Sequence, residues 1–307
     1  MTRILKILAI FLVCFYLVAV GFVYLRQSHF LFLPGIPIRI TPIDFGAAFE
    51  KIDVPCVRGC MQGDNLTGWW LAPPDAAPKP TAADVSSKPD AGAGKSGQVL
   101  LYLHGNAGNI GDNAAHVVRL NRLGPGVFIF DYRGYGESHG PFPTEARVDE
   151  DAESAWSYLT QQRHIDSSQI IIYGHSLGSG IALDLALHHP EAAGLIMESG
   201  YTSVLDMAKR SPFFRWFPLE LLLNQRFDSI SKVTYLKVPV LFIHGTDDTL
   251  IPPEMSRQLY AAAPSPKKLL LIEGGEHDNS AAVGGERYLG PVGEFLRSLA
   301  TRNPASH

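Results

Sequence analysis

The sequence predicts an α/β fold in which a mostly parallel sheet carries helices on both faces. From about residue 98 onward, short segments rich in Val, Ile and Leu alternate with longer segments of helical pattern. Strands buried on both faces form such continuous apolar runs, and their alternation with helices favours parallel pairing. The chain has 307 residues, of which 46% are hydrophobic, so it is long and apolar enough for one large core.

The first predicted element is a membrane-spanning helix. Residues 7–25 contain no charged side chain. At helical rise this run is about 30 Å long, which matches the hydrocarbon thickness of a bilayer. A cleaved signal peptide is the alternative, but its apolar run is normally only about 7–15 residues long and is followed by small residues at a cleavage site. The longer run and the poor site at residues 18–21 favour an uncleaved anchor over residues 1–28, with residues 4–25 contacting the membrane.

Basic groups flank this run on both sides. Arg3 and Lys6 precede it together with the α-amino group, whereas Arg26, His29 and Arg39 follow it. Because the near flank is slightly more basic before the run, the positive-inside rule favours a cytoplasmic N-terminus and an extracytoplasmic main domain.

The next elements lead into the sheet. Residues 29–48 mix apolar side chains with prolines, which predicts a stiff, non-helical connector. Residues 49–303 are expected to form one domain that opens with a hairpin of two strands, 51–54 and 66–71. Residues 73–97 are rich in Ala, Pro, Ser and Gly and lack bulky apolar side chains, so they predict a flexible insertion.

The remaining predicted strands are residues 99–103, 127–130, 170–173, 193–197, 238–243 and 268–272. Between the second and third of them, residues 144–162 have an apolar stripe at helical spacing. Within residues 205–230, an aromatic stretch punctuated by prolines interrupts the alternation. This stretch is either one packed surface helix or a small lid that contacts acyl chains.

Composition excludes several classes of partner. The formal net charge of −4 indicates no basic surface, so no nucleic acid is expected to bind. Three cysteines are too few for a disulfide framework, although the spacing of Cys56 and Cys60 permits one bridge without requiring it. No further zinc ligands lie near this pair, no G-K-[ST] ending follows a glycine-rich loop, and no G-x-G-x-x-G opens the sheet. We expect neither a metal nor a cofactor, and the oligomeric state stays open.

A candidate nucleophile follows the strand at 170–173. The pattern G-H-S-L-G occupies positions 174–178 and precedes an apolar segment of helical character. Between a strand and a helix, G-x-S-x-G is typical of a nucleophile elbow, in which the serine lies at the tip of a strained turn. A plain strand-to-helix turn is the alternative. The elbow makes Ser176 the candidate nucleophile and directs the Leu177 N–H toward a developing oxyanion.

A serine hydroxyl needs a base within hydrogen-bond reach, and that base needs an orienting acid. In an open parallel sheet such groups lie at the carboxyl ends of the strands. Asp248, after the strand at 238–243, is the candidate acid, with the adjacent Asp247 as the alternative. His277 is the candidate base, because it follows the last strand in a glycine-rich loop and completes the chain order Ser-Asp-His.

Other histidines are interpreted as structural. His104 and His244 each follow a strand directly and are expected to shape loops, and His175 is expected to point away from the nucleophile. After His104 the loop is rich in small residues, and the N–H of Asn106 is the candidate second oxyanion donor beside that of Leu177.

Four motifs carry a family resemblance: H-G-N-A-G-N at 104–109, D-Y-R-G-Y-G-E-S at 131–138, G-H-S-L-G at 174–178 and D-T-L-I-P-P at 248–253. They resemble the α/β-hydrolase superfamily, and more narrowly its bud-emergence-type branch of membrane-associated proteins, which includes protein depalmitoylases. The resemblance implies an eight-stranded sheet, a Ser-Asp-His triad and hydrolysis of esters or thioesters without a cofactor. Ser179 stands where relatives usually carry glycine.

The sequence therefore predicts a membrane-anchored serine hydrolase that cleaves carboxylic ester or thioester bonds of lipid or acylated substrates. A serine peptidase or amidase on the same fold is the first alternative, because the triad chemistry is shared. A non-catalytic interaction protein is the second, since a fold can be kept without its activity.

Overall fold

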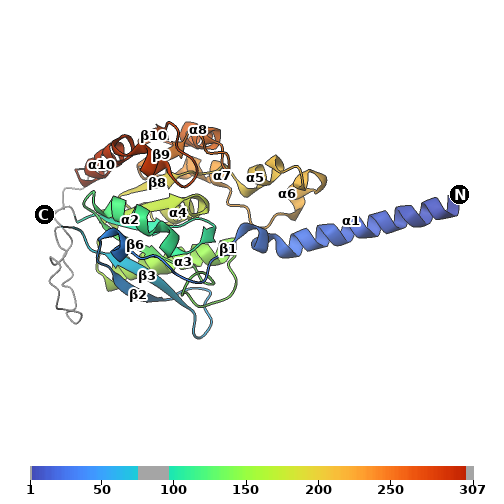
Figure 1. Ribbon diagram of the computed structural model, residues 1–307, viewed down its shortest axis with the longest axis horizontal. Coiled ribbons are helices and arrows are strands. Elements are labelled where there is room, and N and C mark those ends of the chain that lie inside the picture. Colours follow the sequence, from blue (N-terminus) through green and yellow to red (C-terminus); the bar gives the residue numbers. More distant parts are fainter. Residues whose placement is uncertain (1, 75–96, 302–307) are drawn as a thin grey trace.

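A computed structural model describes residues 2–74 and 97–301 (Figure 1). The eight strands that form its main sheet are β2 (Glu50–Pro55), β3 (Asn65–Leu71), β4 (Val99–Leu103), β6 (Gly126–Phe130), β7 (Ile170–His175), β8 (Gly194–Glu198), β9 (Val240–Gly245) and β10 (Lys267–Ile272). They lie in the order β10-β9-β8-β7-β4-β6-β3-β2. Every neighbouring pair from β10 to β6 is parallel, whereas β3 is antiparallel to both of its neighbours. The predicted mostly parallel sheet and its N-terminal hairpin are thus confirmed.

The helices of the described residues are α1 (Thr2–Leu31), α2 (Ala114–Asn121), α3 (Glu145–Ser157), α4 (Leu177–His188), α5 (Val204–Arg210), α6 (Leu219–Leu222), α7 (Ser229–Lys232), α8 (Pro253–Ala262), α9 (Ser280–Gly284) and α10 (Glu286–Ala300). Successive residues of a strand face opposite sides of the sheet, so the central strand β4 contributes to two cores. Leu101 packs in one core with residues of α3, α4 and α8, and Leu100 packs in the other with residues of α2 and α10. Helices therefore cover both faces, as the apolar runs predict.

Helix α3, predicted at residues 144–162, begins directly after its N-cap residue, Thr144. Thr144 has extended backbone angles, and its side-chain oxygen accepts a hydrogen bond from the N–H of Arg147, so one of the free amide groups of the first turn is satisfied. The regular α-helix ends at Ser157 and continues as one π-helical turn to Gln162.

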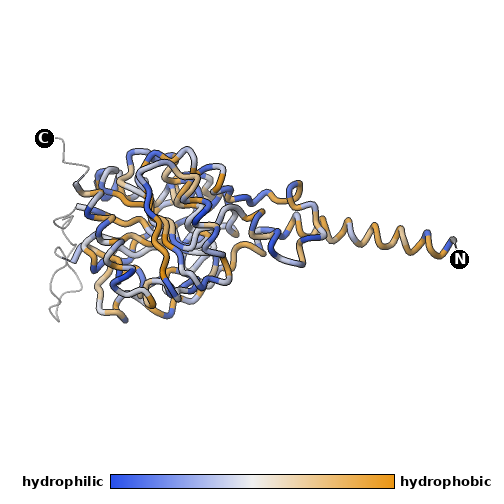
Figure 2. The backbone as a smooth tube through the Cα atoms, turned by 90° about the horizontal axis from the view of Figure 1, so that it is seen from above, coloured by the Kyte–Doolittle hydropathy of each residue, from blue (hydrophilic) through white to orange (hydrophobic). Residues whose placement is uncertain are grey.

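Helix α1 projects from the domain as an apolar rod with the N-terminus at its far end (Figure 2). Residues Arg3–Leu31 are long and apolar enough to cross a membrane. The helix continues to Leu31 and so enters the region expected to be a non-helical connector. The next residue, Phe32, is buried against Phe227, and Leu33–Pro34 forms strand β1, which pairs with β5 (Ala107–Gly108). Through these contacts, the first residues after α1 are packed against the domain.

The segment predicted as a lid, residues 205–230 and called the lid segment below, is not one helix but spans most of three short helices, α5, α6 and α7. Helices α5 and α6 lie near the base of α1, whereas α7 packs against α4 and α8 (Figure 1). Cys56 and Cys60 form a disulfide in the loop between β2 and β3. Most of the insertion predicted at 73–97 lies outside the described residues.

Candidate active site

The turn at Ser176 joins β7 directly to α4. Ser176 has φ +53° and ψ −121°, a left-handed conformation that a residue with a side chain adopts only when the surrounding structure imposes it. A Cβ on Gly174 would lie 2.2 Å from the carbonyl oxygen of Gly178, and one on Gly178 would lie 2.1 Å from that of Leu103. The glycines of the elbow are therefore required by close backbone approach, and the serine hydroxyl is held at the carboxyl end of the sheet.

Two loops from neighbouring strands complete a hydrogen-bonded chain with this serine. The Nε2 atom of His277 lies 2.9 Å from the Oγ of Ser176. The Nδ1 atom of the same ring lies 2.7 Å from Oδ2 of Asp248. The loop after β10 carries the histidine and the loop after β9 carries the aspartate. The structure thus brings together the three side chains that the sequence predicts as nucleophile, base and acid.

Asp248 is fixed in its loop by backbone donors. Its Oδ1 accepts from the N–H groups of Leu250 at 3.0 Å and Ile251 at 2.9 Å, so Oδ2 is left to face His277. Burial by itself raises the pKa of Asp248, but hydrogen bonds from His244, His277 and the Ile251 N–H outweigh burial and hold the pKa well below its usual range. The neighbouring Asp247 is exposed. Of the two adjacent aspartates, Asp248 is the one whose carboxylate contacts the ring of His277.

His277 is correspondingly a stronger base than an ordinary histidine. Burial lowers its pKa, but the hydrogen bond and the charge of Asp248 raise it, and the net effect is upward. A pKa above about 6.5 means that the imidazolium formed on taking a proton is stabilised by the neighbouring carboxylate.

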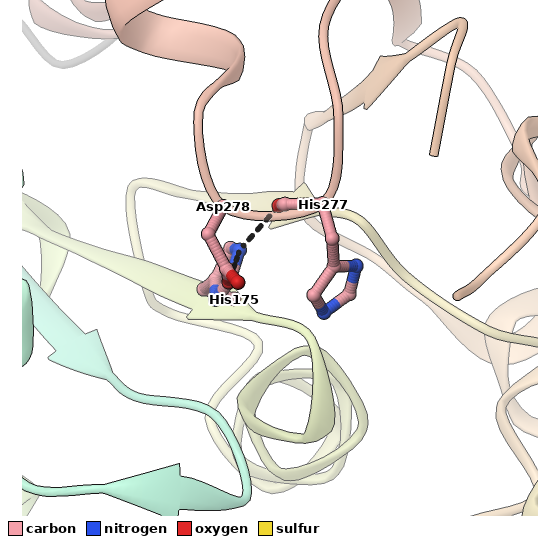
Figure 3. A group of neighbouring side chains, drawn as sticks. All are labelled: His175, His277 and Asp278. Atoms are coloured by element: carbon pink, nitrogen blue, oxygen red, sulfur yellow. Dashed lines mark hydrogen bonds and ion pairs between the residues drawn. The ribbon is translucent and has the colours of Figure 1, made fainter. Parts of the chain in front are cut away.

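Neighbouring residues hold the loop that carries His277 in place, and Figure 3 shows one of them, His175, bonded to this loop. The Nε2–H of His175 donates to the carbonyl oxygen of His277 at 3.1 Å, and the Ser199 hydroxyl donates to the same oxygen at 3.2 Å. The Nε2 atom of His244 lies 3.1 Å from Oδ2 of Asp248, the same oxygen that His277 contacts. The histidines at 175 and 244 are therefore positioning residues, and His104 lies apart from them, 3.5 Å from Asp131.

The side chains of His175, His277 and Asp278 also form the one group of at least three potential metal ligands found among the described residues. Their donor atoms lie within 4.8 Å of one another. Both ring nitrogens of His277 are already hydrogen-bonded, one to Ser176 and the other to Asp248, and Asp278 is largely exposed. A cation could enter only by breaking the chain of hydrogen bonds, so we assign no metal to this group.

Asn106, one of the predicted oxyanion donors, lines both pockets that Ser176 lines, and Leu177, the other, lines one of them. The backbone of Asn106 is fixed at its carbonyl, which accepts from the Tyr135 hydroxyl at 2.7 Å and from the Leu33 N–H at 2.8 Å. The sequence predicts the loop but not these two partners. The 131–138 motif was the sequence signal for Tyr135, its second tyrosine, whereas no motif marked Leu33.

Ser176 lies between two cavities of different character. The apolar pocket has a volume of about 400 Å³. Residues of α1 that include Val23 and Phe30 line one side, and the other side is lined by Val204 at the start of α5 and by residues of the lid segment that include Met207 and Leu219. The polar pocket has a volume of about 420 Å³ and is lined by His116, His175, Glu198, Asp278 and residues of the Asn106 loop. The polar pocket could not be predicted from local motifs.

Glu198, at the end of β8, organises the wall of the polar pocket. Its buried carboxylate accepts from the hydroxyls of Tyr173 and Tyr288, the latter at 3.1 Å, and lies 3.3 Å from the ring nitrogen of His116. Burial raises the pKa of Glu198, but the charge and hydrogen bond of His116 and the charge of His175 lower it to about 2. The sequence signal for Glu198 was a single carboxylate at the end of an otherwise apolar strand.

Comparisons with known proteins agree with this geometry. The sequence matches the Hydrolase_4 family, described as serine aminopeptidase S33, over residues 94–230 and 221–280. An uncharacterized protein of Mycobacterium tuberculosis is 35% identical over 281 residues, which are 92% of this chain and 91% of that protein. Protein bem46 of Schizosaccharomyces pombe is 28% identical over 302 residues, 94% of this chain and 92% of that protein. A lysophosphatidylserine lipase of Danio rerio is 37% identical over 190 residues, 56% of this chain and 48% of that protein.

Among solved structures, an esterase of Pyrococcus furiosus superposes with a TM-score of 0.66 at 20% identity and covers 88% of this chain and 100% of its own. At that identity the likeness supports the fold alone. The match to bem46 confirms the resemblance to the bud-emergence-type branch. With the matched family, its relatives and the eight-stranded sheet in agreement, the chain belongs to the Hydrolase_4 family of α/β-hydrolases and is a serine hydrolase of the esterase and lipase type.

Proposed function

We propose that this protein is a membrane-anchored hydrolase that cleaves carboxylic ester or thioester bonds of lipids or acylated substrates through Ser176, His277 and Asp248. The observation that carries the proposal is the unbroken chain of hydrogen bonds from Oγ of Ser176 through both ring nitrogens of His277 to Oδ2 of Asp248. A serine hydroxyl is a weak nucleophile until an adjacent base can accept its proton.

In the proposed reaction, Nε2 of His277 accepts the hydroxyl proton as Oγ of Ser176 bonds to the carbonyl carbon. The oxyanion accepts hydrogen bonds from the N–H groups of Leu177 and Asn106, and each such donor contributes about 3 kcal/mol to the transition state. Asp248 stabilises the imidazolium, which then protonates the leaving oxygen or sulfur as its bond to carbon breaks. A water molecule then bonds to the acyl carbon as His277 accepts its proton, and the imidazolium returns that proton to Oγ of Ser176 as the bond from Oγ to the acyl carbon breaks and the acid is released.

The two pockets support a substrate with one apolar and one polar part. The apolar pocket suits an acyl chain, and the polar pocket, with its carboxylates and histidines, suits a hydrophilic leaving group. A relative that is a lysophosphatidylserine lipase acts on a substrate of this kind, by its name.

The apolar helix α1 supports membrane anchoring through residues 4–25. The Cys56–Cys60 disulfide supports an extracytoplasmic domain, because disulfides persist mainly in oxidising compartments. Protease digestion of sealed vesicles tests this orientation: the domain should be cut only from the extracytoplasmic side.

A serine peptidase is the second candidate. The family description names an aminopeptidase, and the carboxylates of Glu198 and Asp278 in the polar pocket would attract a substrate α-amino group. Parallel assays of p-nitrophenyl esters and aminoacyl p-nitroanilides decide between them. Hydrolysis of the esters alone supports the proposed function, whereas preferential hydrolysis of the anilides would replace it with the peptidase.

A fluorophosphonate probe tests the nucleophile. The wild-type protein should be labelled and Ser176→Ala should not, while Ser179→Ala, which changes a buried serine three residues along, should be labelled like the wild type. Equal labelling of Ser176→Ala and the wild type would remove Ser176 from the mechanism.

A further inference from the structure

The last turns of the membrane helix are part of the wall of the apolar pocket. Val23, Gln27, Phe30 and Leu31 of α1 line the same cavity as Ser176. Val23 is only 4% exposed, whereas Leu25, two residues further along, is 77% exposed. Helix α1 therefore presents one face to the pocket and the opposite face outward.

Gln27 fastens this face to the lid segment. Its Oε1 accepts from the N–H groups of Asn224 at 2.8 Å and Gln225 at 3.3 Å, and its Nε2 donates to the carbonyl oxygen of Leu222 at 3.3 Å. A second donor bond from Nε2, 2.8 Å long, reaches the Tyr24 carbonyl within α1. A buried amide that is bonded at both its oxygen and its nitrogen fixes the two elements relative to each other.

A second contact joins the end of α1 to the loop that carries Asn106. Nδ2 of Asn106 donates to the carbonyl oxygen of Leu31, the last residue of the helix, at 3.0 Å. Leu33, just beyond the helix, donates its N–H to the carbonyl of Asn106. The end of α1 therefore lies beside the loop that carries Asn106. These two hydrogen bonds hold the part of the pocket wall formed by α1 at a fixed distance from Ser176.

The outer side of this assembly is apolar and continuous with α1. Tyr16 donates its hydroxyl to the carbonyl of Trp216 at 2.9 Å and stacks on Phe217. The side chains of Phe213, Trp216 and Leu221 in the lid segment are exposed beside the helix. A bilayer that surrounds α1 would also cover these side chains, so the mouth of the pocket lies where membrane acyl chains are available.

We propose that α1 is a structural part of the acyl-binding site, with Val23 a specificity-determining residue that limits the length of the acyl chain drawn from the bilayer. The inference rests on the proposed ester hydrolase function and deepens it. It implies that the anchor cannot be exchanged for an unrelated span without changing which acyl chains are hydrolysed.

The full-length protein in detergent micelles provides the test, with p-nitrophenyl acetate and p-nitrophenyl laurate as substrates. Val23→Trp fills the pocket, and the ratio of kcat/KM for laurate to that for acetate should fall by about 10-fold or more, since each excluded methylene loses its burial. Leu25→Trp adds a similar side chain to the outer face of the same helix and should leave the ratio unchanged. Val23→Ala enlarges the pocket and should move the preference toward longer chains.

The outcomes separate the two proposals. If Val23→Trp and Val23→Ala both keep the wild-type ratio, or if Leu25→Trp changes it equally, the role of α1 is overturned. If Val23→Trp is inactive on both esters, Val23→Ala alone decides, and an unchanged chain-length profile overturns the inference. If the wild-type protein hydrolyses neither ester and is not labelled by a fluorophosphonate, the ester hydrolase function itself fails.

Discussion

Oδ2 of Asp248 lies 2.7 Å from Nδ1 of His277, while the carboxylate of the preceding residue, Asp247, accepts instead from the hydroxyl of Thr246 at 2.9 Å. The two adjacent aspartates thus have separate partners. Asp248→Asn should lower kcat by about 10⁴-fold, because the amide cannot stabilise the imidazolium or hold the correct tautomer. Asp247→Asn, the matched control, should change kcat by less than about twofold, since it removes only an exposed charge and keeps an oxygen that can accept from Thr246. Steady-state ester hydrolysis measures both, and equal losses would contradict the assignment of the acid.

The pH dependence of activity should follow the raised pKa of His277. The base must be neutral to accept a proton, so activity is lost as pH falls through the pKa of the ring. Because Asp248 raises this pKa, the acid limb of kcat/KM should have its midpoint above the usual value of about 6.5. A profile of kcat/KM between acidic and mildly alkaline pH measures it. A midpoint below the usual histidine value would show that the carboxylate does not act on this ring.

Substitution of the elbow glycine should destabilise the fold. The Cβ added by Gly178→Ala would lie 2.1 Å from the carbonyl oxygen of Leu103, so backbone must shift, and we expect a loss of at least about 2 kcal/mol. Gly290→Ala is the control, since a Cβ there would meet no atom within 4 Å other than those of its chain neighbours. The gain in helix propensity from alanine is opposed by its contact with the ring of Pro291, the next residue in α10, so this substitution should change the free energy of unfolding much less than Gly178→Ala does. Thermal unfolding in detergent measures both, and equal losses would contradict the role of close backbone approach at Gly178.

Removal of the buried charge of Arg133 should destabilise the domain without altering a residue of the candidate active site. Arg133 is fully buried, and its Nε lies 2.6 Å from Oδ1 of Asp151, with a further ion pair to Glu150 at 2.7 Å. Arg133→Met leaves the buried carboxylate of Asp151 without its charged partner and should lower the free energy of unfolding by about 3–5 kcal/mol. The double variant Arg133→Met/Asp151→Leu removes both charges and should recover part of the loss. No recovery would mean that packing, not charge, accounts for the effect.

Much of the fold followed from local pattern. The strand predicted at 170–173 is β7, Ile170–His175, and the helix predicted from Thr144 begins one residue later, because apolar runs and capping residues act over a few positions. The order Ser-Asp-His along the chain likewise follows from local pattern, because each of the three residues comes shortly after a predicted strand. What local pattern could not predict was the polar pocket, since Glu198 meets Tyr288 and His116 only after three elements have packed together.

By itself, the sequence of this protein determined the alternation of strands and helices, the serine elbow and the apolar N-terminal helix, all of which depend on residues within one or two turns of each other. Only the tertiary structure decided that the end of that helix is a wall of the pocket. Gln27 meets Asn224, 197 positions away, and Leu31 meets Asn106, 75 positions away. Contacts at such separations depend on how the elements pack in three dimensions, and no periodicity along the chain records them.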